Sequence, residues 1–150
     1  MKLAQALQVR SDLQNKADEL RTRLNLNALY QEGEMPNEDP NVLLEELDKV
    51  IEQLEDIIYR IHLTNGKTET REGSLTYLLS KRDALTLQIS IYKSLADQAS
   101  GNIDRYSRKE IKILPSIDIK SLRKKIDKLS KDLRELEMMI QETNWLTDLL

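Results

Sequence analysis

The architecture of this protein can be predicted from one stretch of its sequence, LTYLLSKRDALTLQISIYKSLADQA, residues 75–99. Apolar side chains recur there at alternating steps of three and four residues, which places them on one face of an α-helix. An arginine, Arg82, interrupts this apolar series, and Arg10 interrupts a similar series near the N-terminus. The two series are Leu75, Leu78, Arg82, Leu85, Ile89, Tyr92, Ala96 and Ala99, and Leu3, Ala6, Arg10, Leu13, Ala17, Leu20 and Leu24.

Two further stretches show helical spacing and complete a set of helices. The predicted helices cover about residues 3–28, 40–65, 74–99 and 118–146. Asp39 before Pro40 is typical of a helix start, and Gly66 is suited to the left-handed position after a helix end. The 150 residues therefore predict a single all-α domain. It is either an antiparallel four-helix bundle or a set of helical coiled-coil hairpins that complete their core in an oligomer.

Residues 109–114, between the third and fourth predicted helices, do not follow the helical pattern. Ile111 and Ile113 alternate with polar neighbours and Pro115 ends the run, so we expect a short β-strand. A lone strand must find an edge to pair with, and the nearest candidate, residues 67–70, would lie at the opposite end of an up-down bundle. Pairing with another subunit would resolve this, so the segment favours a homo-oligomer.

The composition argues against several classes of function. Charged residues make up 33% of the chain with a net charge of only -3, which is unlike a dedicated nucleic-acid binder. Cysteine is absent, and the one histidine, His62, is not part of a Glu-x-x-His motif, so we expect no metal and no cofactor. No apolar run approaches the roughly 18 residues that span a bilayer, and the first residues do not resemble a signal peptide. We therefore expect a cytoplasmic protein that does not enter a membrane.

The two arginines in the helical stripes are candidates for a functional site. In an up-down-up-down bundle the first and third helices run parallel, so Arg10 and Arg82 fall at one level. The second and fourth helices reach that level with Asn65 and with Glu142 and Asn144. Buried guanidinium groups need matching charge. This polar layer is either a closed structural network or a site for a small anion such as a carboxylate or phosphate.

A second candidate is the basic segment that contains Arg105, Tyr106 and Arg108. In such a segment the cations can bind phosphates and the aromatic ring can stack on a base. Asp104 and Glu110 flank the segment, so the sequence favours a structural or interface loop over contact with a polyanion. No glycine-rich phosphate loop and no Ser-His-Asp signature is present, so an enzyme is the third alternative, after a scaffold and a binding module.

Several motifs, in order along nearly the whole chain, resemble a small uncharacterised bacterial helical family, some of whose members are labelled septicolysin. They are Met1-Lys2-Leu3-Ala4-x-Ala6-Leu7 with Arg10, Gln31-Glu32-Gly33 with Glu38-Asp39-Pro40, Thr64-Asn65, Arg82-Asp83, Asp104-Arg105-Tyr106-Ser107-Arg108 with Glu110-Ile111-Lys112, and Ile140-Gln141-Glu142 with Asn144-Trp145. Lys109 departs from the small polar residue expected at its position. The resemblance implies no catalytic residues. It implies that the polar residues named above belong to the family's distinctive pattern, and the septicolysin label would imply a membrane-damaging toxin.

Taken together, the sequence predicts a self-associating interaction or scaffold protein with a buried arginine layer. The alternative is a binding module for a small anion or a nucleic-acid phosphate. A membrane-active cytolysin fits the residues less well, because the polar faces carry mixed charges and no long apolar run is present.

Overall fold

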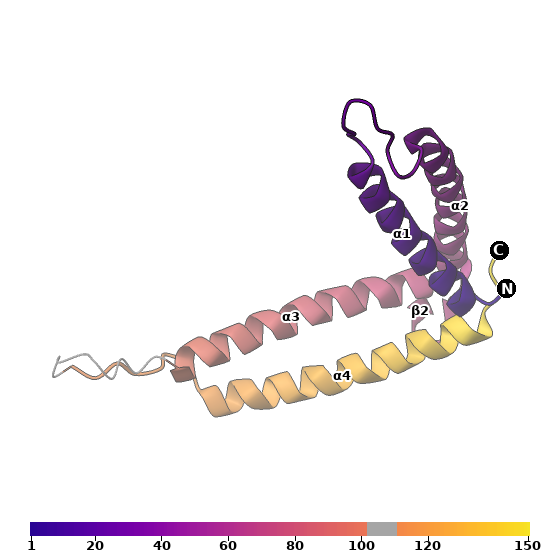
Figure 1. The fold of residues 1–150 in the computed structure, drawn as a ribbon. Coiled ribbons are helices and arrows are strands. Elements are labelled where there is room, and N and C mark those ends of the chain that lie inside the picture. Colours follow the sequence, from indigo (N-terminus) through magenta and orange to yellow (C-terminus); the bar gives the residue numbers. More distant parts are fainter. Residues whose placement is uncertain (102–110) are drawn as a thin grey trace. The chain divides into compact units, whose positions relative to one another are not determined.

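The structure, a computed structural model, describes residues 1–101 and 111–150. Within these residues it contains four long α-helices and two very short strands (Figure 1). In chain order they are α1 (Leu3–Leu26), α2 (Pro40–Lys67), β1 (Glu69–Thr70), β2 (Gly73–Ser74), α3 (Leu75–Gly101) and α4 (Ile119–Leu146). The class predicted from the sequence, all-α with a short strand segment, is confirmed.

Three of the helices begin at side-chain caps that the sequence encodes. Ser74 accepts a hydrogen bond from the backbone N–H of Tyr77 at 3.2 Å at the start of α3. Asp39 accepts a hydrogen bond from the backbone N–H of Asn41 at 2.9 Å at the start of α2. Asp118 accepts one from the backbone N–H of Ser121 at 3.1 Å at the start of α4. Each cap satisfies one of the backbone donors that the first turn of a helix leaves unpaired.

The end of α2 differs from the prediction. Gly66 does not take the left-handed conformation and remains helical. The helix ends instead where the backbone N–H of Thr68 donates to the carbonyl of Thr64 at 2.9 Å. The Thr68 hydroxyl donates to the same carbonyl at 2.8 Å. The last turn is thus satisfied by a threonine, and no glycine turn is required.

The strands lie between α2 and α3, where β1 pairs with β2. Gly73 has a φ of 124°, which favours glycine, and the Thr70 hydroxyl donates to the Gly73 carbonyl at 2.7 Å. Residues 111–114, the described part of the predicted strand, form neither helix nor strand, and residues 109–110 lie outside the described residues. Because β1 finds its partner within the chain, no second subunit is needed to pair it.

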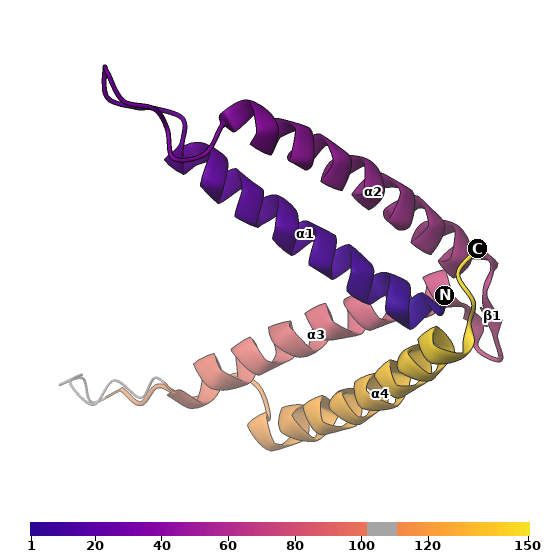
Figure 2. The same ribbon diagram turned by 45° about the vertical axis from the view of Figure 1, so that its right-hand side comes forward.

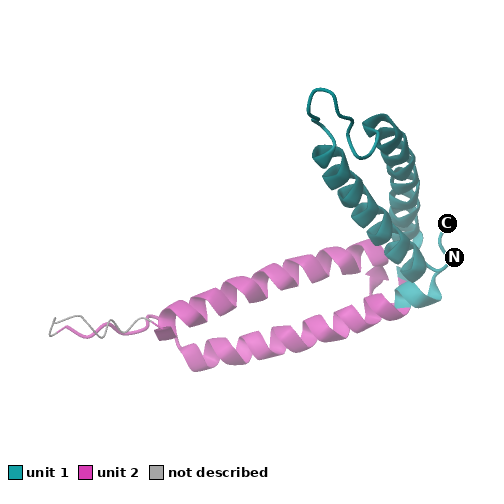
Figure 3. Cartoon of the chain, in the orientation of Figure 1, with its two compact units in different colours: residues 1–69, 143–150 teal, residues 70–142 magenta. Residues whose placement is uncertain are grey.

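The chain divides into two compact units (Figure 3). Residues 1–69 and 143–150 form the first unit, and residues 70–142 form the second. The first contains α1, α2 and the C-terminal residues, and the second contains α3 and most of α4. The prediction that the whole chain forms a single domain stays a prediction.

In the first unit, α1 and α2 form an antiparallel hairpin (Figure 2). Leu20 of α1 is fully buried against Leu43 and Val50 of α2. Leu13, Ala17, Leu24 and Leu47 pack around this cluster. Burying one such leucine removes enough apolar surface from water to contribute about 1.5–3 kcal/mol.

The C-terminal residues close the other end of this hairpin. The backbone N–H of Leu3 donates to the carbonyl of Thr147 at 2.9 Å, which attaches the segment to the start of α1. The backbone N–H of Leu150 donates to the hydroxyl of Thr64 at 3.0 Å, which attaches it to α2. Thr64 is buried, so this contact is protected from water.

In the second unit, α3 and α4 form another antiparallel hairpin (Figure 2). Its described apolar cluster lies toward the end of α3, where Ala96 is buried against Leu122 and Ile126 of α4. Tyr92 packs on the same cluster. Each unit therefore contains a helical hairpin, one of the two architectures that the sequence predicted.

Candidate functional site

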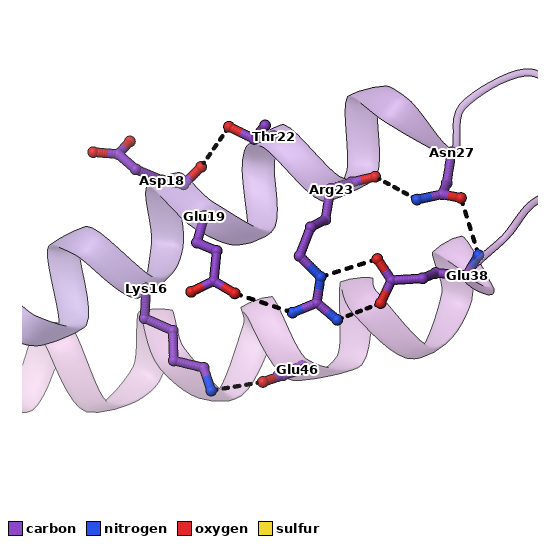
Figure 4. A network of polar contacts seen from close by, with 8 residues as sticks. All are labelled: Lys16, Asp18, Glu19, Thr22, Arg23, Asn27, Glu38 and Glu46. Carbon is purple, nitrogen blue, oxygen red and sulfur yellow. Dashed lines mark hydrogen bonds and ion pairs between the residues drawn. The ribbon is translucent and has the colours of Figure 1, made fainter.

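Polar side chains close the loop end of the α1/α2 hairpin (Figure 4). The Arg23 guanidinium binds both carboxylate oxygens of Glu38, with Nε 3.0 Å from Oε2, and its Nη1 also contacts Glu19 at 3.4 Å. The Asn27 side chain donates to the Arg23 carbonyl at 2.9 Å and accepts from the Glu38 backbone N–H at 3.0 Å. A two-pronged pair of this kind fixes both position and orientation.

The charges in this network stabilise one another. The hydrogen bond from Arg23 holds the pKa of Glu38 below its usual value. Lys16 and Glu46 pair at 2.8 Å, and their hydrogen bond lowers the pKa of Glu46 and raises the pKa of Lys16. Lys16, Arg23, Glu19, Glu38 and Glu46 are thus paired with one another, and these ion pairs join α1 to the loop and to α2.

A groove of about 950 Å³ lies between α3 and α4, within the second unit. Its apolar surface comes from Leu85 on α3 and from Leu136, Met138 and Met139 on α4. The remaining lining residues are Arg71, Glu72, Lys81, Ala84, Gln88, Asp132, Glu135 and Glu142. Methionines adapt to the shape of what they contact, which suits a protein-binding groove.

Acidic side chains predominate on the α4 rim of this groove. Asp132, Glu135 and Glu142 lie there, and Lys81 on the α3 rim is 3.7 Å from Glu72. An apolar floor with an acidic rim suits an apolar helix that carries basic residues along its edge. The lining thus combines apolar side chains with acidic ones on α4 and with the basic side chains of Arg71 and Lys81.

A second groove, of about 640 Å³, opens on another side of the same hairpin. It is lined almost wholly by α3, including Thr86, Lys93 and Asp97, with Leu133 from α4. The α3/α4 hairpin is thus incompletely filled at two places along its length. Protein interiors are normally packed without such gaps, so these surfaces have room for the side chains of another helix.

The outer side of α3 carries a second stripe, which we call the uncharged α3 seam. Its members follow steps of three and four and are Tyr77, Ser80, Ala84, Leu87, Ile91, Ser94 and Gln98. All seven are exposed, and Tyr77, Leu87 and Ile91 are 55%, 62% and 57% exposed. No charged residue interrupts the seam, although charges make up 33% of the chain. Exposed faces of this spacing are typical of helices that pack against another helix.

The two arginines singled out from the sequence have different surroundings. Arg82 belongs to the second unit and pairs with its neighbour Asp83 at 2.8 Å. Arg10 belongs to the first unit and is half-buried. Its Nε atom is buried and has no hydrogen-bond partner in the part of the chain that the structure describes. The charge of Arg82 is therefore matched locally, while Arg10 retains an unused donor.

The position of Arg10 along its hairpin follows from the ion pair between α1 and α2. Lys16 faces Glu46, and an antiparallel register then sets Arg10 opposite α2 near Gln53. Asn65 lies twelve residues farther along α2, which is about 18 Å at the helical rise. The polar layer that would include Arg10 and Asn65 stays a prediction.

The other predicted site residues are distributed over the chain. Asn65 is half-buried and Asn144 is buried, both in the first unit, and Glu142 lines the groove in the second. Arg105, Tyr106 and Arg108 lie outside the described residues. A layer shared by Arg10 and Arg82 would join the two units, and it stays a prediction.

Two kinds of feature are absent from residues 1–101 and 111–150. No group of three or more His, Cys, Asp or Glu side chains there could hold a metal ion. No helix in the same residues is long and apolar enough to cross a membrane.

The fold and its grooves define a protein of two helical hairpins, one closed by ion pairs and one with open apolar surfaces. The chain belongs to a family of unknown function, DUF6847, whose model matches residues 10–149. It is similar to a functionally unknown conserved protein from Corynebacterium diphtheriae, with 40% sequence identity and a TM-score of 0.95. That crystal structure aligns over 100% of this chain and 99% of the other. No curated protein matches this chain.

These comparisons confirm the predicted membership of an uncharacterised helical family. They give no support to the septicolysin label, since neither the family nor the similar structure is described as a toxin.

Proposed function

We propose that the protein is a self-associating helical scaffold whose α3 side forms the contact between copies. The observation that carries this proposal is the uncharged α3 seam. Its seven exposed positions include three large apolar or aromatic side chains and no charge. Leaving such a stripe in water is unfavourable, and covering it with another helix removes that cost.

The two grooves of the α3/α4 hairpin support the same proposal. They leave the half-buried side chains of Leu85 and Leu133 beside open space. A helix laid along the hairpin would fill that space and extend the core. Both grooves belong to the α3/α4 hairpin, so the proposal assigns self-association to the second unit.

Native mass spectrometry and light scattering of the purified protein test this proposal. We expect an oligomer whose mass is a whole number of bare chains. Leu87→Glu and Ile91→Glu place charge in the seam, and each should shift the protein toward monomer. Val42→Glu is the matched control, because Val42 is an exposed apolar residue on α2. A wild-type protein that is monomeric at every concentration contradicts the proposal.

A second function, the binding of a small anion, is favoured by the buried Nε atom of Arg10. This donor has no partner among the described residues, and a carboxylate or phosphate oxygen would satisfy it. Arg82 is less suited to the role, since Asp83 already accepts from its Nε at 3.0 Å. The proposal therefore places the anion at Arg10 alone.

Thermal unfolding with and without inorganic phosphate tests the anion proposal. Added phosphate should raise the midpoint of the wild-type protein, and Arg10→Gln should abolish that shift. Arg21→Gln is the control, because Arg21 is exposed on the same helix and pairs with Asp18 at 2.8 Å. Equal shifts in all three proteins would show general ionic stabilisation and would contradict a site at Arg10.

A further inference from the structure

One side of the α3/α4 hairpin changes character along its length. Near the strands it forms the groove of about 950 Å³ described above. Ala84 and Gln88 form part of the α3 edge of this groove, and Asp132 and Glu135 form part of the α4 edge. This half of the side is concave and acidic.

The other half of the same side is apolar and basic. Ile91 and Leu95 follow Ala84 and Gln88 by seven residues, so they continue the same edge of α3. They are 57% and 43% exposed. On α4, Lys125 and Lys128 precede Asp132 and Glu135 by seven residues and are exposed. Because α3 and α4 are antiparallel, these four side chains share the half of the hairpin that lies away from the groove.

The charge of α4 as a whole shows the same division. Residues 119–134 hold seven lysines and arginines against two aspartates. Residues 135–142 hold three glutamates and no basic residue. A helix that is basic in its first part and acidic in its second part complements a copy of itself that runs in the opposite direction.

We propose that a second copy of this chain packs on this side in an antiparallel arrangement. Ile91 and Leu95 of each copy enter the groove of the other, and Lys125 and Lys128 meet the acidic rim formed by Asp132, Glu135 and Glu142. This inference rests on the proposed self-association and specifies its surface and direction.

The geometry of one copy fits a two-fold axis. Ile91 and Leu95 lie about 10 Å farther along α3 than Ala84 and Gln88, at the helical rise of about 1.5 Å per residue. An axis that crosses α3 near Ser90 exchanges these two pairs of positions. Each contact then forms twice, as a closed two-fold dimer requires. The uncharged α3 seam borders this side, since Ala84 and Ile91 belong to both, and it is partly covered in the same contact.

Charge reversal tests the arrangement. The first variant combines Lys125→Glu with Lys128→Glu, and the second combines Asp132→Lys with Glu135→Lys. Either variant alone sets like charges against each other at both contacts, and we expect dimer dissociation constants to rise by about 100-fold or more. An equimolar mixture of the two should form a heterodimer with near wild-type affinity, because both contacts regain opposite charges. A chain that carries all four substitutions should also dimerise again.

A control variant makes the same change in net charge as the first variant, but on another side of the hairpin. It combines Arg123→Glu with Arg134→Glu, two exposed residues on another side of α4 that line neither groove. This variant should dimerise like the wild type. Circular dichroism of every variant establishes that the helices remain formed.

The outcomes separate this inference from the function on which it rests. Dimerisation that resists both charge-reversed variants, or a mixture that stays monomeric, overturns the antiparallel contact and leaves self-association in place. A wild-type protein that never dimerises overturns both. Recovery in the mixture and in the four-fold variant, without any effect of the control, is the result that the inference predicts.

Discussion

The two hairpins of this protein are built from helices of similar length, yet they differ in how completely they are closed. In the α1/α2 hairpin, Leu20, Leu43 and Val50 are buried together, and Arg23 and Glu38 tie the loop end. In the α3/α4 hairpin two grooves remain open and an uncharged seam stays in water. The first hairpin is held by its apolar cluster and its ion pairs, whereas the grooves of the second are the surface that we propose as an interface. A helical stripe thus indicates burial, but not whether the partner belongs to the same chain.

The largest predicted difference between the two hairpins is in the free energy of unfolding, when the same substitution is made in each. Leu20→Ala removes a fully buried side chain and should lower the free energy of unfolding by about 2–5 kcal/mol. Leu87→Ala makes the same change at a seam residue and should alter it by less than about 0.5 kcal/mol. Urea unfolding at low protein concentration, where copies are separate, measures both. Similar losses for the two variants would contradict the contrast between closed and open hairpins.

A smaller effect is expected where the C-terminal residues meet α2. The Thr64 hydroxyl donates to the Arg60 carbonyl at 2.8 Å and accepts from the Leu150 backbone N–H at 3.0 Å. Thr64→Val leaves that N–H without its acceptor and should cost about 1–3 kcal/mol. Hydrogen exchange at Leu150 should quicken at the same time.

The matched control for this change is Thr86→Val on α3. The Thr86 hydroxyl also donates to the carbonyl four residues earlier, at 2.8 Å, but it is exposed. We expect Thr86→Val to change stability by less than about 0.5 kcal/mol. An equal loss at both positions would mean that the helix bond, and not the contact with Leu150, carries the effect.

A gain of stability is expected at Gly66, which the structure places inside α2. No atom lies within 4 Å of a Cβ built there, so Gly66→Ala should stabilise the protein by about 0.5–1 kcal/mol. Gly73→Ala is the opposite case, because Gly73 has a φ of 124° and its Cβ would meet Tyr77 at 3.0 Å. Thermal unfolding should show a higher midpoint for the first variant and a lower one for the second.

The comparison also shows what the sequence could predict. The spacing of Leu, Ile and Ala gave all four helices close to their observed ends, because burial of one face determines where a helix can form. The predicted helix end at Gly66 was wrong because Thr68 satisfies the last turn of α2. The pairing of residues 69–70 with residues 73–74 was not predicted, because the partner is only three residues away. Local hydrogen bonds of this kind leave little periodic signal.

The candidate site was less predictable than the fold. Arg10 and Arg82 were predicted to form a site because they place charges in apolar stripes. The charge of Arg82, however, is already paired with that of its neighbour Asp83. The uncharged α3 seam was hidden because Ser80, Ala84 and Ser94 are not strongly apolar, and its signal is the absence of charge. The groove depends on how far α3 and α4 separate, which no residue pattern specifies.

The smallest effect concerns the ion pairs that close the α1/α2 hairpin. The pKa of Glu38 is lowered in the folded protein, chiefly by its hydrogen bond with Arg23. A lowered pKa means that the pair contributes stability above the ordinary glutamate pKa of 4.5 and loses it as the pH falls through the folded value. The side chains of Arg23 and Glu38 are 32% and 38% exposed, so solvent screens the pair and the loss should be slight.

Carboxyl titration by NMR measures this effect residue by residue. Arg23→Gln should return the pKa of Glu38 toward its ordinary value. It should move the pKa of Glu46 less, because Glu46 takes its main hydrogen bond from Lys16 at 2.8 Å. If the pKa values of both carboxyls moved equally, the two ion pairs would act as one network. The loop end of the α1/α2 hairpin would then be stabilised by electrostatic interactions that extend beyond the single pairs. Separate responses would show two independent contacts, each of which holds its own turn of the hairpin.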